Sequence, residues 1–230
     1  MIKRAVLFAA LALAACATAP SPAAQSALPP NLGVLKRELI QFYDSGAYWR
    51  AVDAVANEAE AWIAVRAPQV ERPAIVLDID ETSLSSWAVM RANDFGYIPN
   101  GPCELPPRAP CGQHAWEDAA GGAVIQPTLD LYNSARAAGV TVFFVTGRGE
   151  ERRAGTERNL REAGYSEWGS VTLRPVGPRQ PTAEYKSAAR AAIEAQGYTI
   201  IANIGDQQND LDGGHAERAF LIPNPFYSVP

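Results

Sequence analysis

The sequence contains little histidine and cysteine and no long apolar run, and each shortage excludes a class of protein. Only two of its 230 residues are histidines. This count argues against zinc enzymes with several histidine ligands, and against enzymes that use a phosphohistidine with a second catalytic histidine. The longest apolar run, residues 5–15, is too short to cross a bilayer, since a spanning helix takes about 20 residues. The formal net charge is −5, so the chain is also a poor candidate for binding nucleic acid polymers.

The amino-terminal segment has the pattern of an export signal followed by a tether. Basic residues precede the apolar run and small residues follow it, which predicts a signal peptide over residues 1–15. The run ends in Leu-Ala-Ala-Cys, which resembles the lipobox of bacterial lipoproteins and predicts a lipid anchor on Cys16. Ordinary signal cleavage near residues 17–19 is the alternative. Residues 16–31, rich in alanine and proline, are predicted to be a tether. We therefore expect an exported protein that is periplasmic, anchored to the outer membrane through Cys16, or secreted.

The other two cysteines, Cys103 and Cys111, enclose seven residues of which three are proline. In an oxidising compartment the favoured interpretation is a disulfide that closes a loop with little core of its own. A metal site with two cysteine ligands is the alternative, although only one histidine, His114, lies near them in the sequence.

Apolar runs and helical periodicities alternate along the rest of the chain. The apolar runs that we predict to be strands are residues 74–77, 140–145, 200–204 and 219–222. The segments with a helical spacing of apolar residues are 32–66, 128–138, 150–163 and 183–196. Gly139, Gly164 and Gly197 follow the last three of these helices, where a left-handed cap residue is common. Alternation of this kind predicts an α/β fold with a parallel central sheet in three layers, α/β/α.

The first two predicted strands are separated by roughly 60 residues, far more than one helical crossover needs. Residues 91–123 of this stretch carry the cysteine pair and the aromatic residues Phe95, Tyr97 and Trp116. We predict that they form a small cap inserted into one domain, residues 32–230. The three aromatic rings could stack on a nucleotide base or form a core of the cap itself.

Three acidic residues directly follow the first predicted strand, in the segment Asp78-Ile79-Asp80-Glu81-Thr82. Ligand sites in open α/β sheets lie beyond the carboxyl ends of the strands. Carboxylates this close together raise one another's pKa or require a cation. An acid-rich helix start is the alternative; it accounts for Glu81 but not for Asp78, which continues an apolar strand.

A second polar segment, from Gly205 and Asp206 to Asp210, follows the strand predicted at 200–204. Gly205 allows the backbone to approach a ligand closely, and one helical turn would place Asp206 and Asp210 on the same side. A turn rich in Asp, Asn and Gly is the alternative. Two acidic clusters at strand ends favour a hard cation bound by oxygen atoms, magnesium more than zinc.

Two other segments carry candidate anion-binding groups. Thr146 and Gly147 follow the strand predicted at 140–145, where a hydroxyl and a glycine-flanked backbone can donate to a phosphate. Arg148 lies near a helix start, where its charge opposes the helix dipole, so we expect its charge to answer another group. Lys186 lies near the start of another helix, a position that is usually solvated, and only the company of the other segments makes it a candidate.

These segments occur in the order of a known motif set. The pattern Asp78-x-Asp80-x-Thr82, Thr146, Lys186 and Gly205-Asp206-x-x-x-Asp210 resembles the four motifs of the haloacid dehalogenase (HAD) superfamily of phosphotransferases. The stretches Asp-Ile-Asp-Glu-Thr, Thr-Gly-Arg, Tyr-Lys-Ser and Ile-Pro-Asn-Pro-Phe-Tyr are similar to its acid phosphatase branch, which contains the class B and class C bacterial enzymes and the plant vegetative storage protein-like phosphatases. The resemblance covers roughly residues 40–228 and implies a HAD-like Rossmannoid fold. The loop between Cys103 and Cys111 departs from the family, so no substrate preference is carried over.

The resemblance also implies a role for each motif residue. Asp78 would be the nucleophile that forms an aspartyl phosphate. Asp80 would protonate the leaving oxygen and then activate water. The implied ligands of one magnesium ion are Asp78, Asp80 through its backbone carbonyl, Asp206 and Asp210. The implied contacts to the phosphoryl group are Thr146, Gly147 and Lys186.

The resemblance therefore implies a magnesium-dependent acid phosphatase that acts on small phosphate monoesters. One alternative is a phosphotransferase that uses the same site to pass the phosphoryl group to an alcohol. The other is a non-catalytic phosphate-binding or storage relative, although the motif acids and Lys186 are all present. The sequence carries no signal for an oligomeric state.

Overall fold

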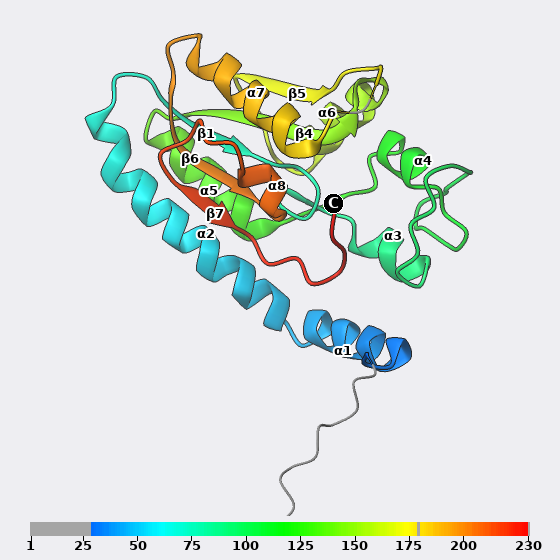
Figure 1. The fold of residues 1–230 in the computed structure, drawn as a ribbon. Coiled ribbons are helices and arrows are strands. Elements are labelled where there is room, and N and C mark those ends of the chain that lie inside the picture. The colour runs from blue at the N-terminus through cyan, green and yellow to red at the C-terminus, as the bar shows by residue number, and fades with distance from the viewer. Residues whose placement is uncertain (1–28, 179, 230) are drawn as a thin grey trace, which may run out of the picture.

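Five parallel strands form the central sheet in the computed structural model, which describes residues 29–178 and 180–229 (Figure 1). All neighbouring strands of this sheet pair in parallel. Their order across the sheet is β5 (Ser170–Arg174), β4 (Thr141–Gly149), β1 (Pro73–Leu77), β6 (Thr199–Gly205) and β7 (Ala219–Leu221). The four strands predicted from apolar runs are confirmed, but β5 is an additional one. It lies at the edge of the sheet and buries only alternate residues, so it lacks the continuous apolar run of a central strand.

Helices cover both faces of this sheet, which confirms the three-layer α/β/α prediction. The helices, in chain order, are α1 (Leu32–Asp44), α2 (Ala47–Arg66), α3 (Trp87–Ala92), α4 (Gln113–Asp118), α5 (Gln126–Ala137), α6 (Arg153–Glu162), α7 (Thr182–Glu194) and α8 (Gln208–Leu211), with short 3₁₀ turns η1 (Ala67–Gln69) and η2 (Glu150–Arg152). On one face, Ile75 and Leu77 of β1 join residues of α2 and α5 in the larger core. On the other, Ala74 and Val76 pack in a smaller cluster with residues of α7. This alternation along β1 follows from the two-residue repeat of a strand.

The helical segment predicted over residues 32–66 is confirmed, and it consists of two helices, α1 and α2. Gly46 separates them with a φ of 74°, a left-handed conformation that an α-helix cannot continue through and that glycine adopts at little cost. The apolar spacing runs across the break because both helices face the same core: the rings of Tyr43 and Tyr48 stack with centroids 5.5 Å apart. Gly139, Gly164 and Gly197 have positive φ after α5, α6 and α7, as predicted.

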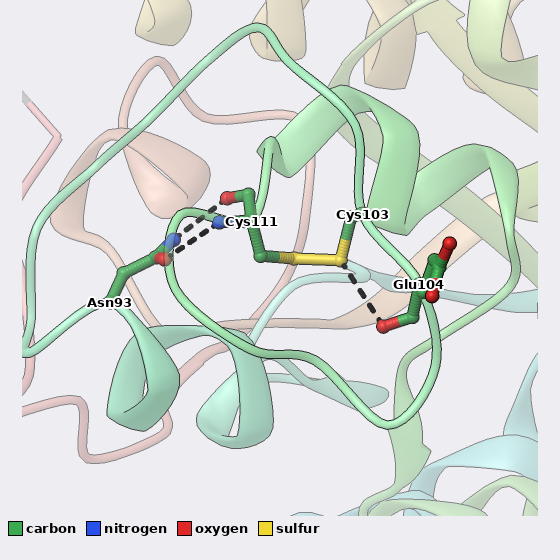
Figure 2. Close-up of a disulfide and its surroundings, with 4 residues drawn as sticks. All are labelled: Asn93, Cys103, Glu104 and Cys111. Atoms are coloured by element: carbon green, nitrogen blue, oxygen red, sulfur yellow. Dashed lines mark hydrogen bonds between the residues drawn. A yellow bond between two sulfur atoms is a disulfide. The ribbon is translucent and has the colours of Figure 1, made fainter.

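The predicted cap, residues 91–123, contains α4 and a loop closed by a disulfide between Cys103 and Cys111 (Figure 2). This bond confirms the favoured interpretation of the pair. The side chain of Asn93 brackets Cys111, accepting from its N–H at 3.0 Å and donating to its carbonyl at 2.8 Å. Helix α4 packs against α6 and η2, and η2 directly follows β4. The predicted cap therefore lies beside the carboxyl end of the sheet.

The three aromatic residues of the predicted cap have different surroundings. Trp116 is buried with Val89 and Cys111 in a small cluster of its own. Phe95 packs instead against the main core, with its ring 5.9 Å from that of Trp87. Tyr97 is 70% exposed. Of the three aromatic residues, only Trp116 therefore contributes to a core of the predicted cap itself.

The predictions for the amino-terminal segment concern residues that the structure does not describe. The predicted signal peptide, most of the predicted tether and Cys16 lie outside the described residues. Within residues 29–178 and 180–229, no helix combines the length and the apolar character that crossing a membrane requires.

We expect Cys103→Ser to lower the free energy of unfolding by about 2 to 3 kcal/mol, because opening a short loop returns that much chain entropy to the unfolded state. The two cysteines are eight residues apart. Urea unfolding with and without dithiothreitol measures the effect: reductant should destabilise the wild type and leave the variant unchanged. An equal response of both proteins to reductant would contradict a stabilising role for this bond.

Candidate active site

The sheet order brings the predicted site residues to one edge. Strand β1 lies between β4 and β6, so Asp78 after β1, Thr146 near the end of β4 and Asp206 after β6 meet at neighbouring strand ends. The N–H of Asp78 donates to the carbonyl of Ile204 at 2.9 Å, which extends the ladder between β1 and β6 to the site itself. The site is therefore built on the most central and most buried part of the sheet.

Three of the predicted metal ligands form one buried group. Asp78, Asp206 and Asp210 each place a carboxylate oxygen within 4.8 Å of the others. The ammonium of Lys186 lies 2.5 Å from one oxygen of Asp78 and 2.5 Å from one oxygen of Asp210. Three carboxylates and one ammonium leave an excess of negative charge in a buried place, and oxygen donors suit a divalent cation such as magnesium. The residues present therefore fit the metal that the resemblance implies.

Burial dominates the protonation of this group. It raises the pKa of Asp78 well above the ordinary value, with Lys186 opposing the rise and Asp210 adding to it. It also raises the pKa of Asp206 to about 7, and the charge of Asp210 contributes. For Lys186 burial acts in the other direction, but the carboxylates of Asp78 and Asp210 hold its pKa above the ordinary value. Lys186 is therefore a cation. A further positive charge in the site would stabilise the ionised forms of Asp78 and Asp206.

Helix α7 supplies this cation and a second buried one from the same face. Arg190 follows Lys186 by one helical turn, so both point toward the loop after β6. The guanidinium of Arg190 donates to the backbone carbonyls of Asp210, Asp212 and Gly214. Its contacts fix the backbone of the loop, whereas Lys186 contacts the carboxylate of Asp210 itself.

Asp80 is not part of this group of three carboxylates and pairs instead with Arg148. The guanidinium of Arg148 donates to both oxygens of Asp80, with the shortest distance 2.7 Å. The Arg148 side chain is 1% exposed and that of Asp80 is 25% exposed, so the carboxylate lies on the solvent side of the pair. The sequence indicated that the charge of Arg148 answers another group, but it did not identify Asp80 as the partner. The role of the Asp80 carbonyl as a metal ligand stays a prediction.

The two predicted phosphate contacts of β4 have different environments. Thr146 is fully buried, and its hydroxyl accepts the N–H of Arg148 at 3.2 Å. Gly147 is exposed, and a Cβ added there would meet no atom within 4 Å. The backbone at Gly147 is therefore open on its outer side, so an anion can approach it.

Two buried glutamates near Asp80 were not predicted as site residues. Glu81 accepts the N–H of Ser86 at 2.5 Å and the hydroxyl of Tyr227 at 2.7 Å. Burial, with the charge of Asp80, raises its pKa to about 8. Glu117 comes from α4 of the predicted cap, and burial, again with the charge of Asp80, raises its pKa to about 7. Glu81 stands in the acidic motif, but no pattern connects Glu117 to it in the sequence.

Comparison with known proteins identifies relatives of this chain by sequence and by fold. The family model of the HAD superfamily, subfamily IIIB (acid phosphatase), matches residues 24–230. The chain is 32% identical over 197 residues to the Stem 28 kDa glycoprotein of Glycine max, covering 84% of this chain and 74% of that one. It is 30% identical over 188 residues to Acid phosphatase 1 of Solanum lycopersicum, covering 81% and 66%. The fold is similar to that of the class C acid phosphatase from Bacillus anthracis, with a TM-score of 0.66 at 18% identity over 85% and 86% of the two chains.

In the presence of EDTA, we expect the free energy of unfolding to fall as the pH rises from about 5 to 8. Glu81, Glu117 and Asp206 have folded-state pKa values of about 8, 7 and 7, above the ordinary values of 4.5, 4.5 and 3.8. The folded protein thus keeps protons that the unfolded chain releases, and this stability is lost as the pH rises. For Glu117 alone the loss is on the order of 3 kcal/mol.

Urea unfolding across this pH range measures the slope. Glu117→Gln should remove part of it, whereas Glu162→Gln, at an exposed position of α6, is the matched control. A stability that rises from pH 5 to 8 in EDTA would contradict the buried, proton-retaining state of these carboxyls.

Proposed function

Because the chain belongs to the HAD superfamily, subfamily IIIB (acid phosphatase), we propose that it hydrolyses small phosphate monoesters through a phosphorylated Asp78. The observation that carries this proposal is the buried group of Asp78, Asp206 and Asp210 with Lys186 at the carboxyl edge of the sheet. Family membership also confirms the resemblance drawn from the four motifs. The roles of the individual residues, the metal and the covalent step are the proposal.

In the first step, a carboxylate oxygen of Asp78 attacks the phosphorus and the bond to the leaving oxygen breaks. Lys186 orients the Asp78 carboxylate, since its ammonium lies 2.5 Å from one oxygen. Asp80 gives a proton to the leaving alkoxide, and the alcohol departs. The products of this step are the free alcohol, the aspartyl phosphate on Asp78 and the carboxylate form of Asp80.

In the second step, Asp80 takes a proton from a water molecule, whose oxygen attacks the phosphorus. The bond between phosphorus and Asp78 breaks, inorganic phosphate leaves, and both aspartates return to their first state. Asp80 is suited to this exchange because it is the partly exposed member of its ion pair. Arg148 returns Asp80 to the same position after each transfer, since it binds both of its oxygens.

The metal proposed for this site is magnesium. Its ligands would be the carboxylates of Asp78, Asp206 and Asp210 and the backbone carbonyl of Asp80. When bound, magnesium neutralises charge on the phosphoryl oxygens and so stabilises the transition state. The chain itself would hold the phosphoryl group through Thr146, the backbone at Gly147 and Lys186. This arrangement lets a protein of net charge −5 bind an anion, because the local charge outweighs the overall one.

We also propose that the protein works outside the cytoplasm. The disulfide between Cys103 and Cys111 fits an oxidising compartment, as does the signal peptide predicted over residues 1–15. Anchoring through a lipid on Cys16 remains part of this proposal.

Purified protein should hydrolyse p-nitrophenyl phosphate with magnesium in mildly acidic solution, at about pH 5 to 6, where general-acid catalysis is favoured. Asp78→Asn should lower kcat by about 10³-fold or more, because it removes the nucleophile. The matched control is Asp118→Asn, the same substitution at a carboxylate that pairs with Arg152. Turnover that is independent of magnesium, or retained in Asp78→Asn, would contradict the proposal.

Asp80→Asn should separate the two steps. With p-nitrophenyl phosphate, whose leaving group needs little protonation, the first step survives and the second lacks its base. We therefore expect a burst of about one p-nitrophenol per protein and an aspartyl phosphate visible by intact mass spectrometry. With an alkyl phosphate there should be no burst, and kcat should fall by roughly 10²–10⁴-fold. Equal losses on both substrates, without a burst, would contradict the assignment of Asp80.

A further inference from the structure

We propose that Asn224 is a positioning residue for Asp206, and that through this contact the segment after β7 sets the affinity of the site for its cation. The proposal rests on the proposed function, because it presumes that Asp206 is a metal ligand. The resemblance assigns no role to Asn224, which lies 18 residues from Asp206 in the sequence.

The segment after β7 crosses the carboxyl edge of the sheet. It is the red chain that runs from β7 to the carboxyl terminus in Figure 1. The N–H of Ile222 donates to the carbonyl of Gly205 at 2.8 Å, directly before Asp206. The amide nitrogen of Asn224 then donates to Oδ2 of Asp206 at 2.7 Å. The segment thus approaches this acid through two successive contacts.

The orientation of the Asn224 amide is determined by its second partner. Its Oδ1 accepts the N–H of Phe226 at 2.9 Å, so the nitrogen is the atom that faces Asp206. Gln207 donates to the same oxygen of Asp206 at 2.6 Å. With Oδ2 occupied by two amide donors, Oδ1 is the oxygen left to face the other carboxylates. Its own contact is the hydroxyl of Thr82 at 3.3 Å.

The side chains that donate to Oδ2 of Asp206, from Gln207 and Asn224, are both neutral amides. Lys186 pairs with Asp78 and Asp210, and Arg148 pairs with Asp80. In the described part of the chain, Asp206 has no cationic partner within ion-pair distance. Amide donors hold the carboxyl group in place without forming an ion pair, so no cationic side chain competes with a metal ion for Asp206.

Contacts on both sides keep Asn224 in position. The ring of Phe226 packs 5.0 Å from that of Trp87 and 5.1 Å from that of Tyr48. The hydroxyl of Tyr227 donates to Glu81 at 2.7 Å, in the loop that carries Asp78 and Asp80. The same segment therefore ties both acidic loops together, and Asn224 is the residue by which it contacts a predicted ligand.

Calorimetric titration of the full chain with magnesium chloride, without substrate, tests the proposal. We expect Asn224→Ala to weaken magnesium binding by about 10- to 100-fold, as for other residues that orient a metal ligand. At saturating magnesium its kcat should recover to within a few fold of wild type. The matched control is Asn209→Ala, which removes a 2.8 Å contact with Val229 of the same segment. The side chain of Asn209 forms no hydrogen bond with a predicted ligand, so the magnesium affinity of this variant should be unchanged.

Urea unfolding in EDTA separates positioning from stability. Unchanged magnesium affinity in a destabilised Asn224→Ala would overturn the proposal, since the segment would then act on stability alone. If Asn224→Ala does not fold, Asn224→Ser is titrated instead, because its shorter side chain cannot span the distance to Asp206. A wild type that hydrolyses phosphate esters without binding magnesium would overturn the metal site itself, whereas wild-type binding that Asn224→Ala matches overturns only the role of Asn224.

Discussion

Repulsion between carboxylates at one edge of the sheet is the constraint on which the rest of the site depends. Asp78, Asp206 and Asp210 approach one another in a buried place, and in the described residues only Lys186 offsets their charge directly. Such a group is tolerable where a strong fold imposes it and where a cation completes it. The parallel order of β4, β1 and β6 imposes it, because three strands end side by side. Helix α7 is positioned by its apolar contacts with the opposite face of β1, and this places Lys186 between two of the acids.

Much of the fold and of this group could be predicted from the sequence, and the exceptions have physical reasons. Buried central strands leave continuous apolar runs, whereas edge strand β5 buries only Val171 and Leu173 of its residues. The break at Gly46 was hidden because apolar spacing continues when two helices share one core. Motif acids at strand ends could be predicted to meet. The sequence predicted that the charge of Arg148 answers another group, but it did not identify that group as Asp80. The contact between Asn224 and Asp206 leaves no periodic or charge signal in the sequence.

The predicted cap is connected to the site by charge and not only by packing. Arg152 of η2 donates to Asp118 of α4 at 3.0 Å, and the neighbouring Glu117 is buried close enough for Asp80 and Arg148 to influence its pKa. The backbone of α4 also approaches α6 closely: a Cβ at Gly155 would lie 2.6 Å from the carbonyl of Glu117. A segment with little core of its own is thereby fixed against α6 and η2, which directly follow the strand that carries Thr146 and Arg148.

The sheet order also has a consequence for when the site comes into existence. Asp78 directly follows the first strand of the sheet, but Lys186 comes 108 residues later, and the contact between Tyr227 and Glu81 joins residues 146 apart. Contacts of such long sequence separation form late, because the intervening chain must first be ordered. A nascent chain that ends before α7 contains Asp78, the proposed nucleophile, but neither Lys186 nor the acids that follow β6. The buried group of Asp78, Asp206, Asp210 and Lys186 can therefore assemble only after the loop that follows β6 has been synthesised.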